Sequence, residues 1–360
     1  MRMLRYKEIK NMLIDRISGM QAGETIPSRT QLCRELDTTR TTIDKAIKEL
    51  EEEKVLESRK GSGTRVIGLI ETAAKDVHNI CVIVPNVSEQ IYSSLLRGID
   101  NAVQNTSTNI ILCNSDNNSD KQEQYISRLM KSGVSGFIMV PTIAYDAKES
   151  SRLYESLVRS KIPFIFCNRG VEGIDAPVVK SNDFYGGYIA VKHLLDMGYS
   201  RIAYIGRQRY RTSIDRCQGY ISAIQERGIS VNRKYIMMPP MNTIQNGYEA
   251  MQQLLGLEDR PDAVFCFNDY VAEGVVRAIE ESGLRVSEDI GVIGYDNTDV
   301  CERSEPKLTS VSFKSEEIGE MAVKILFKEI NGSPPPAFEY YLFQPSIVQR
   351  GSCLGPEGAT

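Results

Sequence analysis

Four threonines and one arginine stand together in TTRTTIDKAIKEL, residues 38–50. β-branched residues are poor helix formers, so their concentration at the start of an expected helix calls for a chemical reason. Short hydroxyls at a helix N-terminus suit phosphate oxygens, and an arginine there reaches a phosphate or a guanine edge. We therefore expect DNA contacts from Thr39, Arg40, Thr41 and Thr42. The alternative is that one threonine caps the helix and the others are solvated.

A second set of polar residues follows apolar runs further along the chain. The stretches are PNVSEQIY, RQRYRTSIDRCQGY, CFNDY and IGYDNTD. Polar loops after parallel strands line ligand clefts in α/β proteins. Asp296 and Asn268 suit vicinal hydroxyls, Arg216 offers a planar donor fork and Tyr92 an apolar face. Taken singly, Asp296 and Arg216 could instead form a loop cap or a salt bridge.

Metal and cofactor chemistry has little support. The chain has two histidines, and its eight cysteines are scattered without a CxxC pair. We expect no metal ligands, no cofactor and no Ser-His-Asp triad, and we expect the cysteines to be buried reduced thiols. The glycine-rich GSGT does not lie at a strand-to-helix turn, so it is not a phosphate cradle.

The first 67 residues carry the signals of three helices and a hairpin. Helical spacing of apolar residues begins at Tyr6, and Ser28 is an expected N-cap of a second helix. The third helix buries a stripe of Ile43, Ala46, Ile47 and Leu50. VLESRKGSGTRVI then reads as two short strands around a glycine-rich tip. This order is that of a winged helix-turn-helix, with residues 68–78 as a linker.

From residue 79 onward, short apolar strands alternate with helical patterns. Such alternation predicts parallel sheets covered on both faces, and the length favours two lobes. The expected fold class is therefore α/β: a winged helix-turn-helix followed by a two-lobed domain over 79–353. We place lobe 1 at about 79–181 and 312–336, and lobe 2 at about 182–311 and 337–353.

Charge and hydropathy agree with this division. Residues 1–67 contain 14 Lys and Arg against 11 Asp and Glu, whereas the whole chain has a net charge of −4. A basic head on an acidic body suggests that only the head meets a polyanion. No apolar run approaches the ~20 residues of a membrane helix, and the N-terminal segment is unlike a secretory signal. We expect a cytoplasmic protein with no membrane partner.

The head resembles the GntR-type winged-helix DNA-binding domain over residues 5–67. The resemblance rests on IPSRTQL, on TTRTTIDKAI and on GSGT. The family usually has Glu where this chain has Arg29, and Arg where it has Asp44. Asp44 could accept from a cytosine amino group or pair with Lys48. The expected DNA-contacting residues are Ser28, Arg29, Thr39, Arg40, Thr41, Thr42, Lys45, Gly61 and Gly63.

The body resembles the LacI/GalR-type effector domain, which is itself similar to periplasmic sugar-binding proteins. The resemblance covers about residues 79–350, and RVSEDIGVIGYDNTD is its most specific part. It implies an effector site formed by Tyr92, Thr212, Arg216, Asn268 and Asp296. Relatives often have an aromatic residue at Asn242, so the ligand class is left open.

A GntR-type head on a LacI-type body is the layout of arabinose-repressor-type regulators. It implies a non-enzymatic, dimeric repressor of sugar-utilisation genes that a small sugar releases from operator DNA. An effector that strengthens DNA binding, such as a nucleobase, is the alternative. A transport-type binding protein fits poorly, because the chain has the winged head and lacks a signal. A cytoplasmic α/β sugar enzyme is less favoured, since no acid/base pair stands out.

Overall fold

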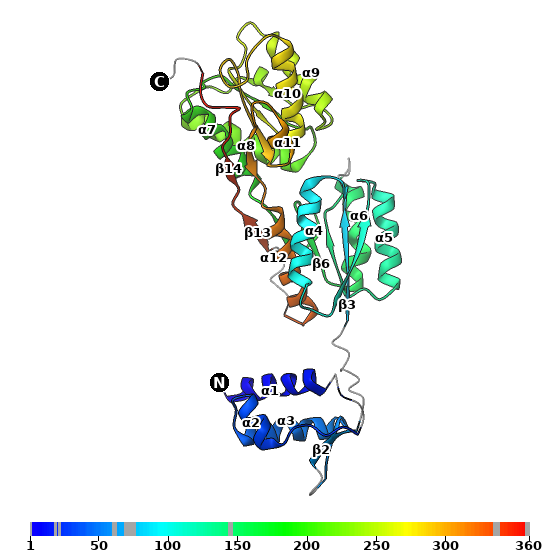
Figure 1. Cartoon of the computed structure of the whole chain (residues 1–360). Coiled ribbons are helices and arrows are strands. Elements are labelled where there is room, and N and C mark those ends of the chain that lie inside the picture. Colours follow the sequence, from blue (N-terminus) through cyan, green and yellow to red (C-terminus); the bar gives the residue numbers. More distant parts are fainter. Residues whose placement is uncertain are drawn as a thin grey trace. The chain divides into compact units, whose positions relative to one another are not determined.

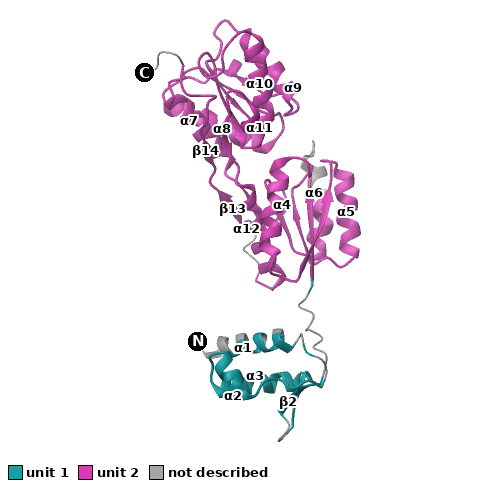
Figure 2. Ribbon diagram, in the orientation of Figure 1, with its two compact units in different colours: residues 1–77 teal, residues 78–360 magenta. Residues whose placement is uncertain are grey.

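The computed structural model describes residues 2–17, 20, 23–59, 63–67, 77–142, 147–333 and 339–356. The chain divides into two compact units, Met1–Val77 and His78–Thr360 (Figure 2). Most of the expected linker, residues 68–76, lies outside the described residues. Within the described ranges, no helix combines the length and apolarity that a membrane crossing requires.

Unit 1 contains three helices and a hairpin (Figure 1). In chain order they are α1 (Arg2–Ile17), α2 (Arg29–Glu35), α3 (Arg40–Glu52), β1 (Leu56–Arg59) and β2 (Gly63–Val66). β1 and β2 pair antiparallel, with Leu56 opposite Val66. The predicted apolar stripe of α3 is buried, and it packs with Leu13 of α1 and Leu32 of α2 in one small core. The predicted winged helix-turn-helix is thus the observed fold of this unit.

The first lobe of unit 2 is a six-stranded parallel sheet in the order β13-β7-β6-β5-β3-β4. Its strands are β3 (His78–Val84), β4 (Thr108–Asn114), β5 (Gly136–Met139), β6 (Phe164–Cys167), β7 (Val178–Ser181) and β13 (Tyr340–Phe343). Its helices are α4 (Gln90–Val103), α5 (Ser119–Lys131), α6 (Ala147–Ser160) and α12 (Ser315–Ile330). α4 and α12 cover one face, and α5 and α6 cover the other.

The second lobe has a sheet in the order β14-β12-β11-β10-β8-β9, parallel except for β14. Its strands are β8 (Ile202–Ile205), β9 (Ile236–Met237), β10 (Ala263–Cys266), β11 (Gly291–Asp296), β12 (Thr309–Ser312) and β14 (Ser346–Val348). Its helices are α7 (Asp183–Asp196), α8 (Arg211–Glu226), a 3-10 turn (Arg233–Tyr235), α9 (Ile244–Leu255), α10 (Asp269–Glu281) and α11 (Val300–Arg303). α7 and α8 cover one face of the sheet, and α9 and α10 the other.

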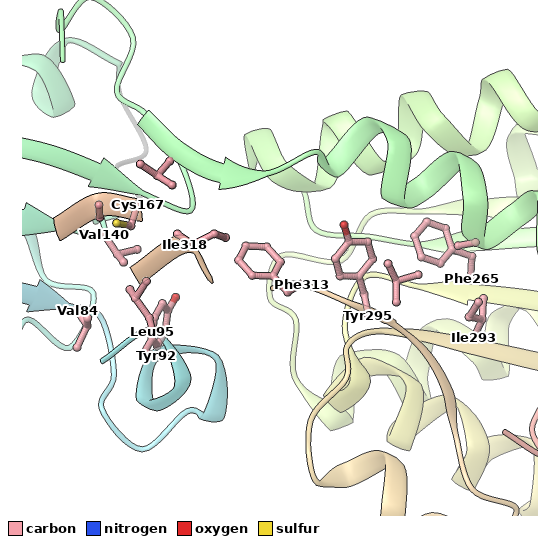
Figure 3. Close-up of a cluster of buried hydrophobic side chains, with 14 of the residues drawn as sticks. Val84, Tyr92, Leu95, Val140, Cys167, Phe265, Ile293, Tyr295, Phe313 and Ile318 are labelled. Atoms are coloured by element: carbon pink, nitrogen blue, oxygen red, sulfur yellow. The ribbon is translucent and has the colours of Figure 1, made fainter. Parts of the chain in front are cut away.

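The chain crosses between the lobes three times, after β7, after β12 and between β13 and β14 (Figure 1). Phe313 lies on the second crossing, with Tyr295 on one side and Ile318 of α12 on the other (Figure 3). One expected boundary is wrong: residues 340–343 were assigned to lobe 2. β13 pairs with β7 and therefore belongs to the sheet of lobe 1, because the chain returns there before its last crossing.

Candidate functional site

The N-terminus of α3 presents a cluster of hydroxyls. Thr39 is the N-cap residue with extended backbone, and its hydroxyl oxygen lies 2.9 Å from those of both Thr41 and Thr42. It makes no side-chain hydrogen bond to the helix backbone, so capping does not account for these residues. Arg40 is 74% exposed in its side chain. Exposed hydroxyls and an exposed guanidinium at a helix N-terminus form a suitable surface for phosphates.

Arg29 and Asp44 form one charge pair. Arg29 Nε donates to Asp44 Oδ1 over 2.6 Å, and its other nitrogens donate to Thr64 Oγ1 and Ser58 Oγ of the hairpin. Asp44 Oδ2 also lies 3.9 Å from Arg40 Nε. Of the two alternatives for Asp44, the pairing with Lys48 does not form, and Lys48 lies 3.9 Å from Glu52 instead. The pair therefore connects α2, α3 and the wing.

The other expected DNA contacts differ in their surroundings. Ser28 caps α2 by accepting from the Gln31 amide, 3.3 Å away. The ammonium of Lys45 lies 3.9 Å from the centre of the Tyr6 ring in α1, so the structure does not join it to the threonine cluster. Gly63 has a φ of +83°, a conformation that favours glycine, at the start of β2. Gly61 lies outside the described residues.

In unit 2, all five expected effector residues line one cavity of about 670 Å³ between the lobes. Tyr92 comes from α4 of lobe 1, and the other four come from lobe 2: Thr212, Arg216, Asn268 and Asp296. The four polar stretches singled out in the sequence all contribute to its wall. Aromatic side chains, Tyr210, Phe267, Tyr270 and Phe313, add apolar faces. The cavity therefore combines hydrogen-bonding groups with ring-sized flat surfaces, as small-molecule sites do.

Arg216 anchors the lobe 2 side of this cavity. Only 2% of its side chain is exposed, and it lies against the Tyr295 ring, with 3.4 Å between Cζ and the ring centre. Its Nε donates to Asp183 Oδ1 over 3.1 Å, and its Nη2 lies 3.7 Å from Asp296 Oδ1. The crossing of α7 and α8 requires Gly187, since a Cβ there would lie 2.2 Å from the Arg216 carbonyl oxygen. Arg216 thus positions Asp296 as well as lining the cavity.

Asp296 and Asn268 differ in how they are held. Asn268 accepts from the Val271 amide at 3.0 Å and caps α10, which fixes its side chain. Asp296 sits at the end of β11 with φ of +95°, and one carboxylate oxygen is buried without a hydrogen-bond partner. Burial raises the pKa of the Asp296 carboxyl to about 7, and the Arg216 guanidinium counteracts this in part. The Asp296 carboxyl thus lies in the cavity wall with hydrogen-bonding capacity left over.

Several cavity residues were not singled out in the sequence. Asn168 and Arg169 follow β6, and Arg207 follows β8. Asn242, which stands where relatives often have an aromatic residue, accepts from Arg207 Nη1 over 3.1 Å. For Asn168, Arg169 and Arg207 the available signal was positional, because each lies within two residues of the end of an apolar strand, and Arg207 begins the stretch RQRYRTSIDRCQGY. Among the described residues, no group of three or more His, Cys, Asp or Glu could hold a metal ion.

Comparison with known proteins matches each unit separately. Residues 5–66 match the family described as bacterial regulatory proteins, gntR family, and residues 191–353 match a periplasmic binding protein-like domain. The HTH-type transcriptional repressor PurR of Mannheimia succiniciproducens is 33% identical over 298 residues, which cover 82% of this chain and 84% of the relative. The arabinose metabolism transcriptional repressor of Geobacillus stearothermophilus is 26% identical, over 97% of both chains.

Solved structures agree in fold. A LacI family transcriptional regulator from Enterococcus faecium with bound ribose superposes with a TM-score of 0.65 at 30% identity. The match covers 77% of this chain and 99% of the regulator. These relatives are named as transcriptional repressors or regulators, not as enzymes.

Proposed function

Because the chain belongs to the LacI-type family of transcriptional repressors and carries a gntR-family DNA-binding head, we propose that it represses sugar-utilisation genes and leaves its operator when a small sugar binds. The observation that carries this proposal is the gathering of five polar and aromatic residues around one inter-lobe cavity. The Enterococcus faecium regulator, which has the same fold, binds ribose.

On the DNA side, α3 is the proposed recognition helix. Thr39, Thr41 and Thr42 would contact phosphates, and Arg40 a phosphate or a base edge. Arg29, Gly63 and Gly61 would extend the contact to the wing, with Ser28 and Lys45 at its margin. Two copies of such a head read the two halves of an operator in a homodimer.

Switching requires that the sugar prefer one arrangement of the lobes. The three crossings between the lobes are the proposed hinge, with closure over a ligand as the motion. A differential affinity of a few kcal/mol between the two states is enough to change operator occupancy. Closure in one homodimer would alter the separation of its heads and so their match to the half-sites.

A nucleobase that strengthens DNA binding is the second candidate. The PurR relative is 33% identical, and the aromatic faces in the cavity would also suit a planar ring. A releasing sugar would lower the affinity for the operator, whereas a co-repressing nucleobase would raise it, so one measurement separates the two candidates.

The test measures operator binding with and without ligand. A duplex selected by the full-length protein from a random library is titrated by fluorescence anisotropy in the presence of pentoses, hexoses, their phosphates and nucleobases. Release by a sugar supports the proposal, whereas tighter binding with a nucleobase overturns it in favour of co-repression. Turnover of any of these sugars by the protein would also contradict it.

A variant pair connects the response to the cavity. D296N removes the charge that lines the cavity, whereas D299N changes an exposed carboxylate three residues away. D296N should bind the duplex as the unmodified protein does and need a higher ligand concentration for the response, and D299N should behave as the unmodified protein in both.

A further inference from the structure

Two nearly buried arginines in the effector cavity have no carboxylate partner. Arg169 follows β6 of lobe 1 and is 7% exposed, and Arg207 follows β8 of lobe 2 and is 8% exposed. Among the described residues, neither guanidinium lies within ion-pair distance of an Asp or Glu. A buried cation without an anion costs free energy, so such a pair indicates that something else supplies the charge.

The groups that hold these arginines are all uncharged. Arg169 Nε donates to the Pro141 carbonyl over 2.7 Å, and its Nη1 donates to the Tyr210 hydroxyl over 2.8 Å. Arg207 Nη1 donates to Asn242 Oδ1 over 3.1 Å. Arg169 Nη2 and Arg207 Nε are buried without any hydrogen-bond partner. Each guanidinium thus has one nitrogen without a hydrogen-bond acceptor.

The two guanidiniums converge on one side chain. Their Cζ atoms lie 5.5 Å and 5.2 Å from the centre of the Tyr210 ring. Arg169 and Arg207 come from different lobes, so the ring lies where the two walls of the cavity face each other. The Tyr210 ring thus brings the two guanidiniums to one part of the cavity.

Other charged groups of the cavity neutralise this pair only in part. Arg216 is already compensated by Asp183 and Asp296. Glu89 also lines the cavity. Its carboxylate accepts from Asn86 over 3.2 Å, and burial raises its pKa while the nearby Arg169 and Arg207 guanidiniums act to lower it. One carboxylate outside ion-pair distance thus stands against two guanidiniums. The cavity therefore holds an excess of positive charge on the side of Arg169 and Arg207.

We propose that the effector is a small polyol carrying an oxyanion, a phosphate or a carboxylate, which binds between Arg169 and Arg207. Its hydroxyls would then face Asp296, Asn268 and the unpaired oxygen of Asn168. The fork geometry of arginine suits both oxyanions. This inference rests on the proposed function, and it narrows the sugar to a sugar phosphate or a sugar acid.

The placement of the two arginines also explains why such an anion would close the lobes. Like charges on opposite walls repel when the cavity is empty, and a shared anion converts this repulsion into attraction. The ligand would then differ in affinity between the open and closed states, which a ligand must do to shift their equilibrium.

The experiment uses matched ligands on the full chain. Thermal-shift and calorimetric titrations compare glucose with glucose 6-phosphate and glucuronate, ribose with ribose 5-phosphate, arabinose with arabinonate, and inorganic phosphate alone. We expect an anionic member to bind where its neutral partner does not. The comparison of phosphates with carboxylates identifies which oxyanion the site prefers.

Variants assign the binding to the two arginines. R207Q and R169Q should each weaken the anionic ligand by about ten- to a hundredfold, as expected for a lost charge-assisted hydrogen bond. R207K should retain part of the affinity, because it keeps the charge without the fork. R209Q changes an exposed arginine of the same loop outside the cavity wall and should bind normally.

R207Q makes the test decisive, since Arg207 donates to fewer protein oxygens than Arg169 and its loss leaves the lobe contacts of Arg169 in place. Circular dichroism and operator binding check that the variants fold. Equal affinity of R207Q and the unmodified protein for the anionic ligand would overturn the inference. So would a panel in which only neutral sugars bind, although that result would leave the proposed function standing. A panel in which nothing binds would contradict both.

Discussion

Arg29 and Asp44 are each unusual for a GntR-type head, and the structure shows that they are partners. Relatives usually have Glu and Arg at these positions, so the two charges are exchanged in this chain. The 2.6 Å contact explains why both departures occur together. Neither residue is buried, so the pair adds under about 1 kcal/mol to stability. The pair matters instead for DNA binding, because it sets the charge beside the proposed recognition helix.

Reversing the charge of Asp44 should therefore change DNA binding more than folding. D44R places a third arginine beside Arg29 and Arg40, which both pair with Asp44, and this should raise nonspecific affinity and steepen its salt dependence by about one to two released ions. R29E/D44R puts the two charges in their usual positions and should shift sequence preference towards that of relatives. Selection from random duplexes and anisotropy across salt concentrations measure both effects. E52R makes the same charge change at the far end of α3 and should leave preference unchanged; identical preference in D44R would refute this role.

Asp296 should make ligand binding depend on pH. Its pKa of about 7 in the folded protein lies above the ordinary 3.8, so the folded state holds an extra proton between those values. The contribution of this group to stability is therefore greatest below pH 4 and decreases as the pH rises through 7. Charges from Arg216, Asp269, Asp183 and Glu89 act on it as well.

A carboxylate that accepts ligand hydroxyls binds best when ionised. Affinity for the ligand should then rise about tenfold between pH 6 and pH 8. D296N should remove this dependence, and any slope left in D296N reports titration of the ligand or of other groups. Calorimetry at three pH values measures the effect, and parallel profiles for D296N and the unmodified protein would exclude Asp296 as its source.

At the scale of elements, the α7–α8 crossing holds Arg216 in place. A Cβ on Gly187 would lie 2.2 Å from the Arg216 carbonyl, so G187A must push the two helices apart. We expect a loss of about 1–3 kcal/mol in the free energy of unfolding and weaker ligand binding. G256A is the matched control, because a Cβ there lies 3.5 Å from its nearest neighbour and φ is negative. Urea unfolding measures both variants, and equal midpoints would contradict the tight crossing.

The central strands β3, β5, β6, β8, β10 and β11 were predictable because each is buried on two faces and reads as a continuous hydrophobic run. β13 and β14 were not predictable, because the tyrosine-rich YYLF and the three residues SIV carry little signal of their own. β13 obtains its place from pairing with β7, a tertiary partner that local sequence does not specify. The misplaced lobe boundary has this cause.

Some residues of the candidate site could likewise be predicted from the sequence, and others could not. Tyr92, Thr212, Arg216, Asn268 and Asp296 could be proposed because they fall in recognisable segments after strands. Arg169 and Arg207 follow strands too, and Arg207 begins one of the polar stretches, but position alone did not distinguish them from surface arginines. Only the fold shows that both are buried, face one cavity and lack a carboxylate.

At the scale of the whole molecule, the head and the body must be coupled for the protein to work as a switch. Thermodynamic linkage requires that the effector weaken operator binding by the same factor by which the operator weakens effector binding. We expect this factor to be about 5–150, the usual range for a coupling of 1–3 kcal/mol. Titrating the effector into free protein and into the protein–duplex complex measures it directly.

The stoichiometry of that complex, two chains per duplex, tests the proposed homodimer. D296N should leave operator affinity unchanged and weaken effector binding, whereas D44R should change operator affinity and leave effector affinity in free protein unchanged. A factor of one would mean that the two units act independently. If the ligand instead strengthened operator binding, it would be a co-repressor.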